Sequence, residues 1–196
     1  MRRFLVLLVL STALGFGVSF AAVQESAFPG IAAGDPKSET KIEFYLSPTC
    51  PMCAATFRNT VLPLLSLAAS GTDLFVFVGI MPRSNEDVKF ARVLSCVPQA
   101  QLLSFMADWY FYRRNGPASF KHLLSMGKNH GITGANEEQC ANERNDRVLL
   151  GFNHLVFTDQ GLKETPAIFL NGKNVPNTYY LWQLEERLPQ LVRSKK

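Results

Sequence analysis

Residues 50–53, Cys-Pro-Met-Cys, stand at the point where an apolar run changes to a helical pattern. The run Ile-Glu-Phe-Tyr-Leu at 42–46 is typical of a strand, and Ser-Pro-Thr at 47–49 ends it. A cysteine at a helix start lies beside free backbone N–H groups, which together with the helix dipole stabilise its thiolate. Cys53 lies one turn after Cys50 on the same face and can resolve a mixed disulfide. This stretch therefore indicates thiol–disulfide exchange.

The first 21 residues have the features of a secretory signal peptide. Arg2 and Arg3 precede an apolar stretch, Phe4 to Leu14, and small residues around Ala21 suit a signal peptidase. We therefore expect cleavage near Ala21 and a mature protein that acts outside the cytoplasm. An uncleaved leader that anchors the protein in a membrane is the alternative.

Length and charge limit the remaining possibilities. A chain of 196 residues can bury one sizeable core, so one elaborated domain is expected over 41–196. Without Arg2 and Arg3, the 20 basic residues become 18, against 16 acidic ones. A nucleic-acid-binding surface needs clustered Lys and Arg, and the sequence has no such cluster, so no nucleic-acid partner is expected.

The first half of the chain predicts a tether and then a strand, a helix and a second strand. The segment 22–40 is rich in Ala, Gly and Pro and predicts a tether with at most a short strand. Strands are predicted over 41–46 and 74–80, with a helix between them over 50–69 that Pro63 should kink. This order implies a parallel strand pair joined by a right-handed crossover.

The second half predicts an inserted helical subdomain followed by a hairpin. The pattern is helical from about 84 to 157, with aromatic residues at i, i+4 and i+7 from Phe105. A strand then follows over 167–170, and Asn-Gly at 171–172 predicts a hairpin turn whose partner strand opens at Val175. Leucines between 181 and 191 predict a last helix with one apolar face.

The four cysteines allow three pairings in an oxidising compartment. Cys50 and Cys53 are the favoured pair because of their spacing, which leaves Cys96 and Cys140. The second pair is either a structural bridge between two inserted helices or a second redox pair that shifts the potential of the first.

Thr165-Pro166 precedes the strand at 167–170 and its Asn-Gly turn, and this corner resembles the cis-proline corner of the thioredoxin fold. With the Cys-Pro-x-Cys motif and the helical insertion, residues 41–192 resemble the DsbA-like family of bacterial disulfide oxidoreductases. The resemblance implies an α/β protein: a thioredoxin fold with a long inserted α-helical subdomain.

The resemblance also implies roles for individual residues. Cys50 would be the exposed nucleophile and Cys53 the buried resolving thiol, while Pro51 and Met52 would tune the redox potential. Pro166 would pack against the disulfide, and the backbone of Thr165 would bind an extended client. Relatives with a second cysteine pair in the helical region support a structural Cys96–Cys140 bridge.

The expected function is disulfide exchange with client proteins in the periplasm. A membrane redox partner would reset the cysteine pair, and no bound cofactor is needed because the disulfide carries the redox equivalent. The oxidase direction is favoured, since a stabilised thiolate makes the disulfide a stronger oxidant. A threonine before the proline also occurs in isomerases and reductases of this fold, which is the first alternative.

A second alternative is a module that handles Cu(I), for which the two thiols around Met52 are soft ligands. No bound metal is predicted, because the three histidines show no ligand spacing.

The sequence also departs from many relatives at one place. They have a buried acid six residues before the first cysteine, where this chain has Phe44, and Glu43 stands one residue earlier.

Overall fold

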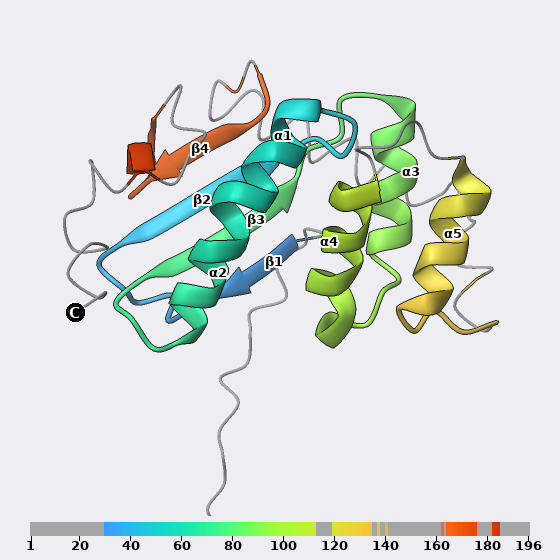
Figure 1. The fold of residues 1–196 in the computed structure, drawn as a ribbon, viewed down its shortest axis with the longest axis horizontal. Coiled ribbons are helices and arrows are strands. Elements are labelled where there is room, and N and C mark those ends of the chain that lie inside the picture. Colours follow the sequence, from blue (N-terminus) through green and yellow to red (C-terminus); the bar gives the residue numbers. More distant parts are fainter. Residues whose placement is uncertain are drawn as a thin grey trace, which may run out of the picture.

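The computed structural model describes residues 30–112, 119–134, 137, 140, 162, 164–175 and 182–184. Within these ranges a five-stranded sheet is crossed by one long helical run, and a group of further helices lies beside one end of the sheet (Figure 1). The predicted leader, most of the predicted last helix and the later part of the helical insertion lie outside the described residues. The predicted thioredoxin fold with inserted helices is confirmed.

The sheet has the order β1 (Gly30–Ala33), β3 (Phe75–Ile80), β2 (Lys41–Leu46), β4 (Ala167–Leu170) and β5 (Lys173–Asn174). β2 and β3 are parallel, with Phe44 opposite Val78, as the strand–helix–strand order predicts. The other neighbours pair antiparallel. β2, which leads to the cysteines, is therefore central and paired on both edges.

One detail of the sheet falls within the sequence-based expectation, which allowed the tether a short strand, and one differs from it. β1 lies inside the predicted tether and extends the sheet at its edge, with Ile31 buried. The hairpin partner opens at Lys173 and not at Val175, because Asn171 and Gly172 both adopt positive φ and form a two-residue turn. Lys173 therefore pairs directly with Leu170.

The predicted helix over 50–69 is confirmed, but it is not a regular α-helix. It consists of α1 (Pro51–Thr56), a π-helical segment η1 (Phe57–Val61) and α2 (Leu62–Ala69). The widened turn lies directly before Pro63, which has no N–H to donate to the preceding turn. The run 51–69 is long and apolar enough to cross a membrane, but half of it is buried inside the fold, as in a core helix.

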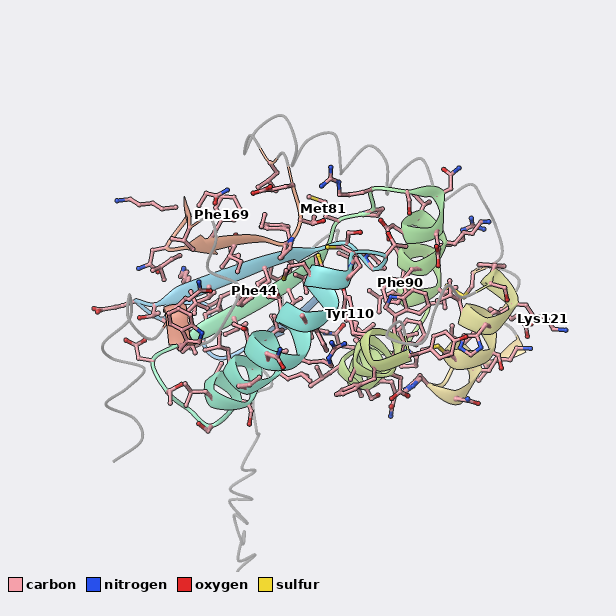
Figure 2. The ribbon with its side chains drawn as sticks, turned by 45° about the horizontal axis from the view of Figure 1, so that its top comes forward. Phe44, Met81, Phe90, Tyr110, Lys121 and Phe169 are labelled. Atoms are coloured by element: carbon pink, nitrogen blue, oxygen red, sulfur yellow. A yellow bond between two sulfur atoms is a disulfide. The ribbon has the colours of Figure 1, made fainter. Side chains whose placement is uncertain are left out.

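The two faces of β2 carry different cores. Ile42, Phe44 and Leu46 are fully buried and face α1, η1 and α2. Tyr45 points to the opposite face, where it packs with a smaller cluster that includes Met81 and Phe169. Figure 2 labels these last two residues. Because side chains alternate along a strand, residues 42, 44 and 46 share the face that lies under the cysteine-bearing helix.

The inserted helices form their own layer against this core. They are α3 (Asn85–Leu94), the short 3-10 turn η2 (Gln99–Gln101), α4 (Leu102–Tyr112) and α5 (Phe120–Asn129). Ser84 and Ser119 cap α3 and α5 by accepting backbone N–H bonds. Phe90 of α3 packs against Phe105 and Trp109 of α4, with ring centroids 5.4 and 5.0 Å apart.

Cys96 and Cys140 form a disulfide in this helical layer, with Cα atoms 5.9 Å apart and a sequence separation of 44. On the chain-entropy account, closing a loop of this size lowers the entropy of the unfolded chain and stabilises the fold by about 4 kcal/mol.

We expect the double variant Cys96→Ala/Cys140→Ala to lose about that unfolding free energy in chemical denaturation, with the reactivity of Cys50 unchanged. The oxidised wild-type protein is the control. An unchanged unfolding midpoint would contradict the structural role of the bridge, and a changed Cys50–Cys53 potential would favour the redox alternative.

Candidate active site

Cys50 is the N-cap residue of α1 and lies four residues after the end of β2. Its backbone is extended (φ −80°, ψ 120°), and its Sγ accepts the N–H of Cys53 at 3.3 Å. Pro51 follows at the first helical position, which suits a proline because that N–H has no helical partner. The first turn of the helix therefore presents its free donors to the sulfur of Cys50.

The surroundings lower the pKa of Cys50 to about 6. The largest cause is a hydrogen bond from the Cys53 side chain; the Cys53 backbone N–H, the Thr165 side chain and the Met52 backbone add to it, while partial burial opposes them. Cys50 is half-buried, so its sulfur remains within reach of solvent. At neutral pH this thiol is mostly a thiolate, which is the nucleophilic form.

Cys53 has the opposite character. It is completely buried, and burial together with the neighbouring Cys50 raises the pKa of its thiol far above the ordinary range. Both cysteines are free thiols in this structure. The pair thus joins an accessible thiolate to a sheltered thiol one turn away.

The structure brings Thr165 and Pro166 to this site from the far end of the chain. The Thr165–Pro166 peptide bond is cis, and the Cys50 thiol donates to the carbonyl oxygen of Thr165 at 3.5 Å. Pro166 is buried and Thr165 is partly exposed. The side chain of Met52, two residues after Cys50, is 42% exposed. All the residues predicted for the site except Cys96 and Cys140 therefore gather around Cys50.

Glu43 does not reach the cysteines. It lies on the opposite face of β2 from Phe44, and its carboxylate accepts a hydrogen bond from Tyr45 at 3.1 Å. Phe44, which is fully buried, occupies the position on the face under α1. Of residues 43 and 44 of β2, only the apolar Phe44 therefore lies on the face of the sheet toward α1.

Asp87 anchors the loop that precedes Cys50, and the sequence analysis did not single it out. Its side chain is fully buried at the start of α3. One carboxylate oxygen accepts from the Thr49 N–H at 2.7 Å, and the other accepts from the Ser47 hydroxyl and the Arg83 N–H, both at 2.8 Å. The insertion thus holds the chain directly before the reactive thiol.

Trp109 of α4 makes a second connection to the same loop, because its ring N–H donates to the carbonyl oxygen of Pro48 at 3.0 Å. The Ser84-x-x-Asp87 spacing could have predicted a helix start, and Ser84 does accept the Asp87 N–H at 3.1 Å. Nothing in the sequence shows that the carboxylate of Asp87 would serve residues 47–49. That contact depends on how the insertion packs on the sheet.

In the part of the chain that the structure describes, no three or more His, Cys, Asp or Glu side chains gather as metal ligands. Within that part, the Cu(I) alternative depends on Cys50 and Cys53 alone.

The comparisons with known proteins agree with this architecture. A family model described as Thioredoxin matches residues 26–186. A Rickettsia typhi protein named as a protein-disulfide oxidoreductase is 26% identical over 160 residues. That match covers 74% of this chain and 55% of the relative, so the chain spans about half the length of the curated relative it matches.

Three solved structures have the same fold at low sequence identity. Wolbachia pipientis α-DsbA1 is 16% identical, with a TM-score of 0.70 over 84% of this chain and 92% of that one. A protein-disulfide isomerase of Novosphingobium aromaticivorans is 14% identical, with a TM-score of 0.68 over 87% and 100%. The thiol-disulfide oxidoreductase MdbA of Corynebacterium diphtheriae is 20% identical, with a TM-score of 0.64 over 80% and 89%. The matched family model covers most of the chain, and the chain therefore belongs to the thioredoxin family, with the inserted helices of the DsbA-like fold.

Proposed function

We propose that this protein is an exported thiol–disulfide oxidoreductase that exchanges a Cys50–Cys53 disulfide with client proteins. One observation carries the proposal: a half-exposed thiol whose pKa is lowered to about 6 lies beside a fully buried thiol one helical turn away. The first can attack or be attacked, and the second is shielded from other reactants. The name of the Rickettsia relative supports the same chemistry.

The exchange proceeds through a mixed disulfide. A client thiolate attacks the Sγ of Cys50 in the oxidised protein, a client–Cys50 disulfide forms, and Cys53 leaves with the electron pair of the broken S–S bond. A second client thiolate then attacks the client sulfur of the mixed disulfide and releases Cys50 as a thiolate. The client is oxidised and the protein becomes a dithiol.

The oxidase direction is supported by the stabilised Cys50 thiolate. A stabilised thiolate favours the reduced protein, so that the disulfide form gives up its oxidising equivalents readily. A reset by a membrane redox partner is required for repeated turnover. The Cys96–Cys140 bridge supports an oxidising compartment, and hence export, because such bridges persist mainly outside the cytoplasm.

The Thr165 backbone supports a mode of client binding. Its carbonyl oxygen lies 3.5 Å from the Cys50 sulfur, next to a partly exposed segment that ends in β4. An extended client chain can pair with this backbone as a strand would, which places the client sulfur beside Cys50. The exposed side chain of Met52, two residues after Cys50, offers an apolar contact to a client.

A pH series of alkylation tests the central observation. The rate of Cys50 alkylation by iodoacetamide should rise with pH and be half-maximal near pH 6, since only the thiolate reacts. Cys53 should stay unmodified at neutral pH because its pKa is raised by burial. The denatured protein is the control, in which both thiols should titrate near about 8.5. A folded-state midpoint at or above that value would overturn the proposal.

The reduction potential then decides the direction of electron flow. We expect a value between about −120 mV, as for DsbA, and about −270 mV, as for thioredoxin, because the pKa of Cys50, about 6, lies between those of the two proteins. Equilibration with glutathione buffers measures it directly. A value at the thioredoxin end would assign the protein to reduction or isomerisation, which are the alternatives of the same fold.

A further inference from the structure

The residues directly before α1 form a tight turn whose central peptide group needs hydrogen-bond partners from elsewhere in the chain. The N–H of Cys50 donates to the carbonyl oxygen of Ser47 at 3.2 Å, which closes a β-turn over 47–50 with Pro48 in its second position. This bond leaves the central peptide group, which consists of the Pro48 carbonyl and the Thr49 N–H, without a partner inside the turn. Because Pro48 is buried, its carbonyl oxygen must be paired by another part of the protein.

Two inserted helices bind the two ends of this peptide group. The ring N–H of Trp109 in α4 donates to the Pro48 carbonyl oxygen at 3.0 Å, and the carboxylate of Asp87 in α3 accepts the Thr49 N–H at 2.7 Å. The C=O and the N–H of a trans peptide group point in opposite directions, and the group is planar. The two contacts together therefore fix both the position and the rotation of the Pro48–Thr49 peptide, which neither contact does alone.

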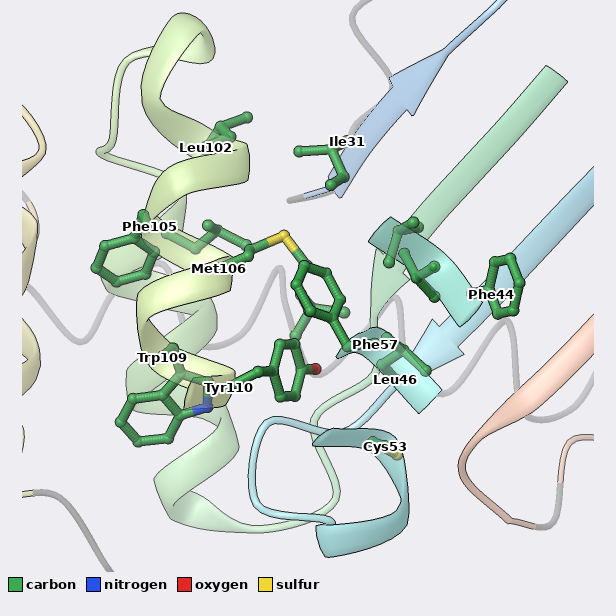
Figure 3. Close-up of a cluster of buried hydrophobic side chains, with 14 of the residues drawn as sticks. Ile31, Phe44, Leu46, Cys53, Phe57, Leu102, Phe105, Met106, Trp109 and Tyr110 are labelled. Carbon is green, nitrogen blue, oxygen red and sulfur yellow. The ribbon is translucent and has the colours of Figure 1, made fainter. Parts of the chain in front are cut away.

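Trp109 is itself held firmly. Its side chain is fully buried, and its ring packs against Phe90 of α3 with centroids 5.0 Å apart. The next residue, Tyr110, joins α4 to the cysteine-bearing helix, because its ring stacks on Phe57 at 4.6 Å and its carbonyl oxygen accepts from Arg58 at 2.9 Å. Figure 3 shows Trp109 and Tyr110 on α4 beside this helix. The indole donor is therefore placed by contacts with both α3 and the cysteine-bearing helix.

The turn determines where the sulfur of Cys50 lies. Cys50 is both the last residue of the turn and the N-cap of α1. Its Sγ lies 3.3 Å from the backbone nitrogen of Cys53 and 3.5 Å from the carbonyl oxygen of Thr165, which belongs to a distant part of the chain. Hydrogen bonds weaken steeply when their distance and angle change, so a displaced turn would weaken the contacts of this sulfur.

We propose that Trp109 is a positioning residue of the active site, which together with Asp87 holds the Pro48–Thr49 peptide at both ends and thereby fixes the sulfur of Cys50. This inference rests on the proposed function. Because the two side chains bind one rigid peptide group, their effects on Cys50 are coupled. Once either contact is lost, the peptide can rotate, and the loss of the second contact changes less than it would alone.

The variant Trp109→Phe tests the role of the indole N–H, because it removes this donor and keeps an aromatic ring. The midpoint of Cys50 alkylation by iodoacetamide, near pH 6 in the wild type, should rise by about 0.5 to 1 pH unit, which corresponds to the loss of part of one hydrogen bond to the thiolate. Phe105→Leu is the matched control, since it removes a buried ring from the same helix and keeps the indole. This control should lower the unfolding midpoint and leave the alkylation midpoint unchanged.

The double variant Trp109→Phe/Asp87→Asn tests whether both side chains act through the same peptide group. Its alkylation midpoint should rise by less than the sum of the two single shifts. Two independent anchors of the loop would instead give additive shifts. All alkylation profiles are measured at a temperature below the unfolding midpoint of every variant.

A second readout keeps Trp109 in place and uses the NMR signal of its indole N–H. The chain has two tryptophans, of which Trp109 is fully buried and Trp182 is 57% exposed, so hydrogen exchange distinguishes their signals. Asp87→Asn should shift the Trp109 signal and accelerate its exchange about three- to tenfold, because the peptide that binds it gains freedom. Trp182 is the internal reference, and Glu86→Ala, the other acid at the start of α3, should change neither signal.

Three outcomes would overturn the inference: an unchanged alkylation midpoint in Trp109→Phe, an equal rise in Phe105→Leu, or additive shifts in the double variant. If Trp109→Phe does not fold, an unchanged Trp109 indole signal in Asp87→Asn overturns it. A wild-type alkylation midpoint at or above about 8.5 defeats the proposed function first, and this inference fails with it. A wild-type midpoint near pH 6 that Trp109→Phe shares defeats the role of Trp109 alone.

Discussion

Replacing Cys50 by alanine should abolish thiol–disulfide exchange, with a loss of at least about a thousandfold in the reduction of insulin or the oxidation of a reduced client. The remaining thiol of the pair cannot take over, because Cys53 is fully buried and its pKa is raised far above neutrality. The fold should be retained, since a half-buried N-cap side chain contributes little to the core.

Replacing Cys53 by alanine should give a different failure. Cys50 still attacks a client disulfide, but nothing within the protein resolves the product, so mixed disulfides accumulate on non-reducing gels. The pKa of Cys50 should also rise from about 6, because the hydrogen bond from the Cys53 side chain is its largest stabilising influence.

The double variant Cys96→Ala/Cys140→Ala is the control for both experiments, since it removes two cysteines and leaves the pair at the site intact. Residual exchange in Cys50→Ala at more than a small fraction of the wild-type rate would contradict the assignment of Cys50 as the nucleophile.

Replacing Asp87 by alanine should destabilise the protein by about 3–5 kcal/mol, which chemical denaturation measures directly. The carboxylate is fully buried and accepts bonds from the Ser47 hydroxyl and from the N–H groups of Thr49 and Arg83. Alanine leaves these donors without an acceptor in a place that water reaches poorly. Asp87→Asn should cost less, about 1–3 kcal/mol, because one oxygen remains.

Both substitutions of Asp87 should also change the pKa of Cys50, because Cys50 directly follows Thr49, which Asp87 anchors. Without its anchor, the loop no longer holds the sulfur of Cys50 against the first turn of α1, so the pKa of Cys50 should rise from about 6 toward its ordinary value. The alkylation profile of the folded Asp87→Asn variant measures this shift at temperatures below its unfolding midpoint.

Glu86→Ala is the matched control for Asp87. Glu86 is the other acid in the first turn of α3, so its removal takes the same charge from the helix start. Its expected cost is less than about 1 kcal/mol, with no change in the alkylation profile of Cys50. Equal effects of the two substitutions would show that Asp87 acts only on its own helix.

The parts of this fold that the sequence predicts well are those with local signals. Three of these signals depend only on neighbouring residues, and the structure has all three elements. They are the apolar run of 41–46, its parallel partner strand over 74–80 and the Asn-Gly turn at 171–172. The opening of β5 at Lys173 was missed because Lys and Asn are poor strand formers, and pairing with β4 overrides that preference.

The sequence by itself determined that two thiols stand one turn apart at a helix start, because spacing and capping act over only four residues. Only the tertiary structure decided what surrounds them. The contacts of Asp87, Trp109 and Tyr110 with residues 47–58 join residues 38 to 61 positions apart, so they depend on how the insertion packs. Long-range packing buries Cys53 and so raises the pKa of its thiol, whereas the lowered pKa of Cys50 depends first on Cys53, only three residues away.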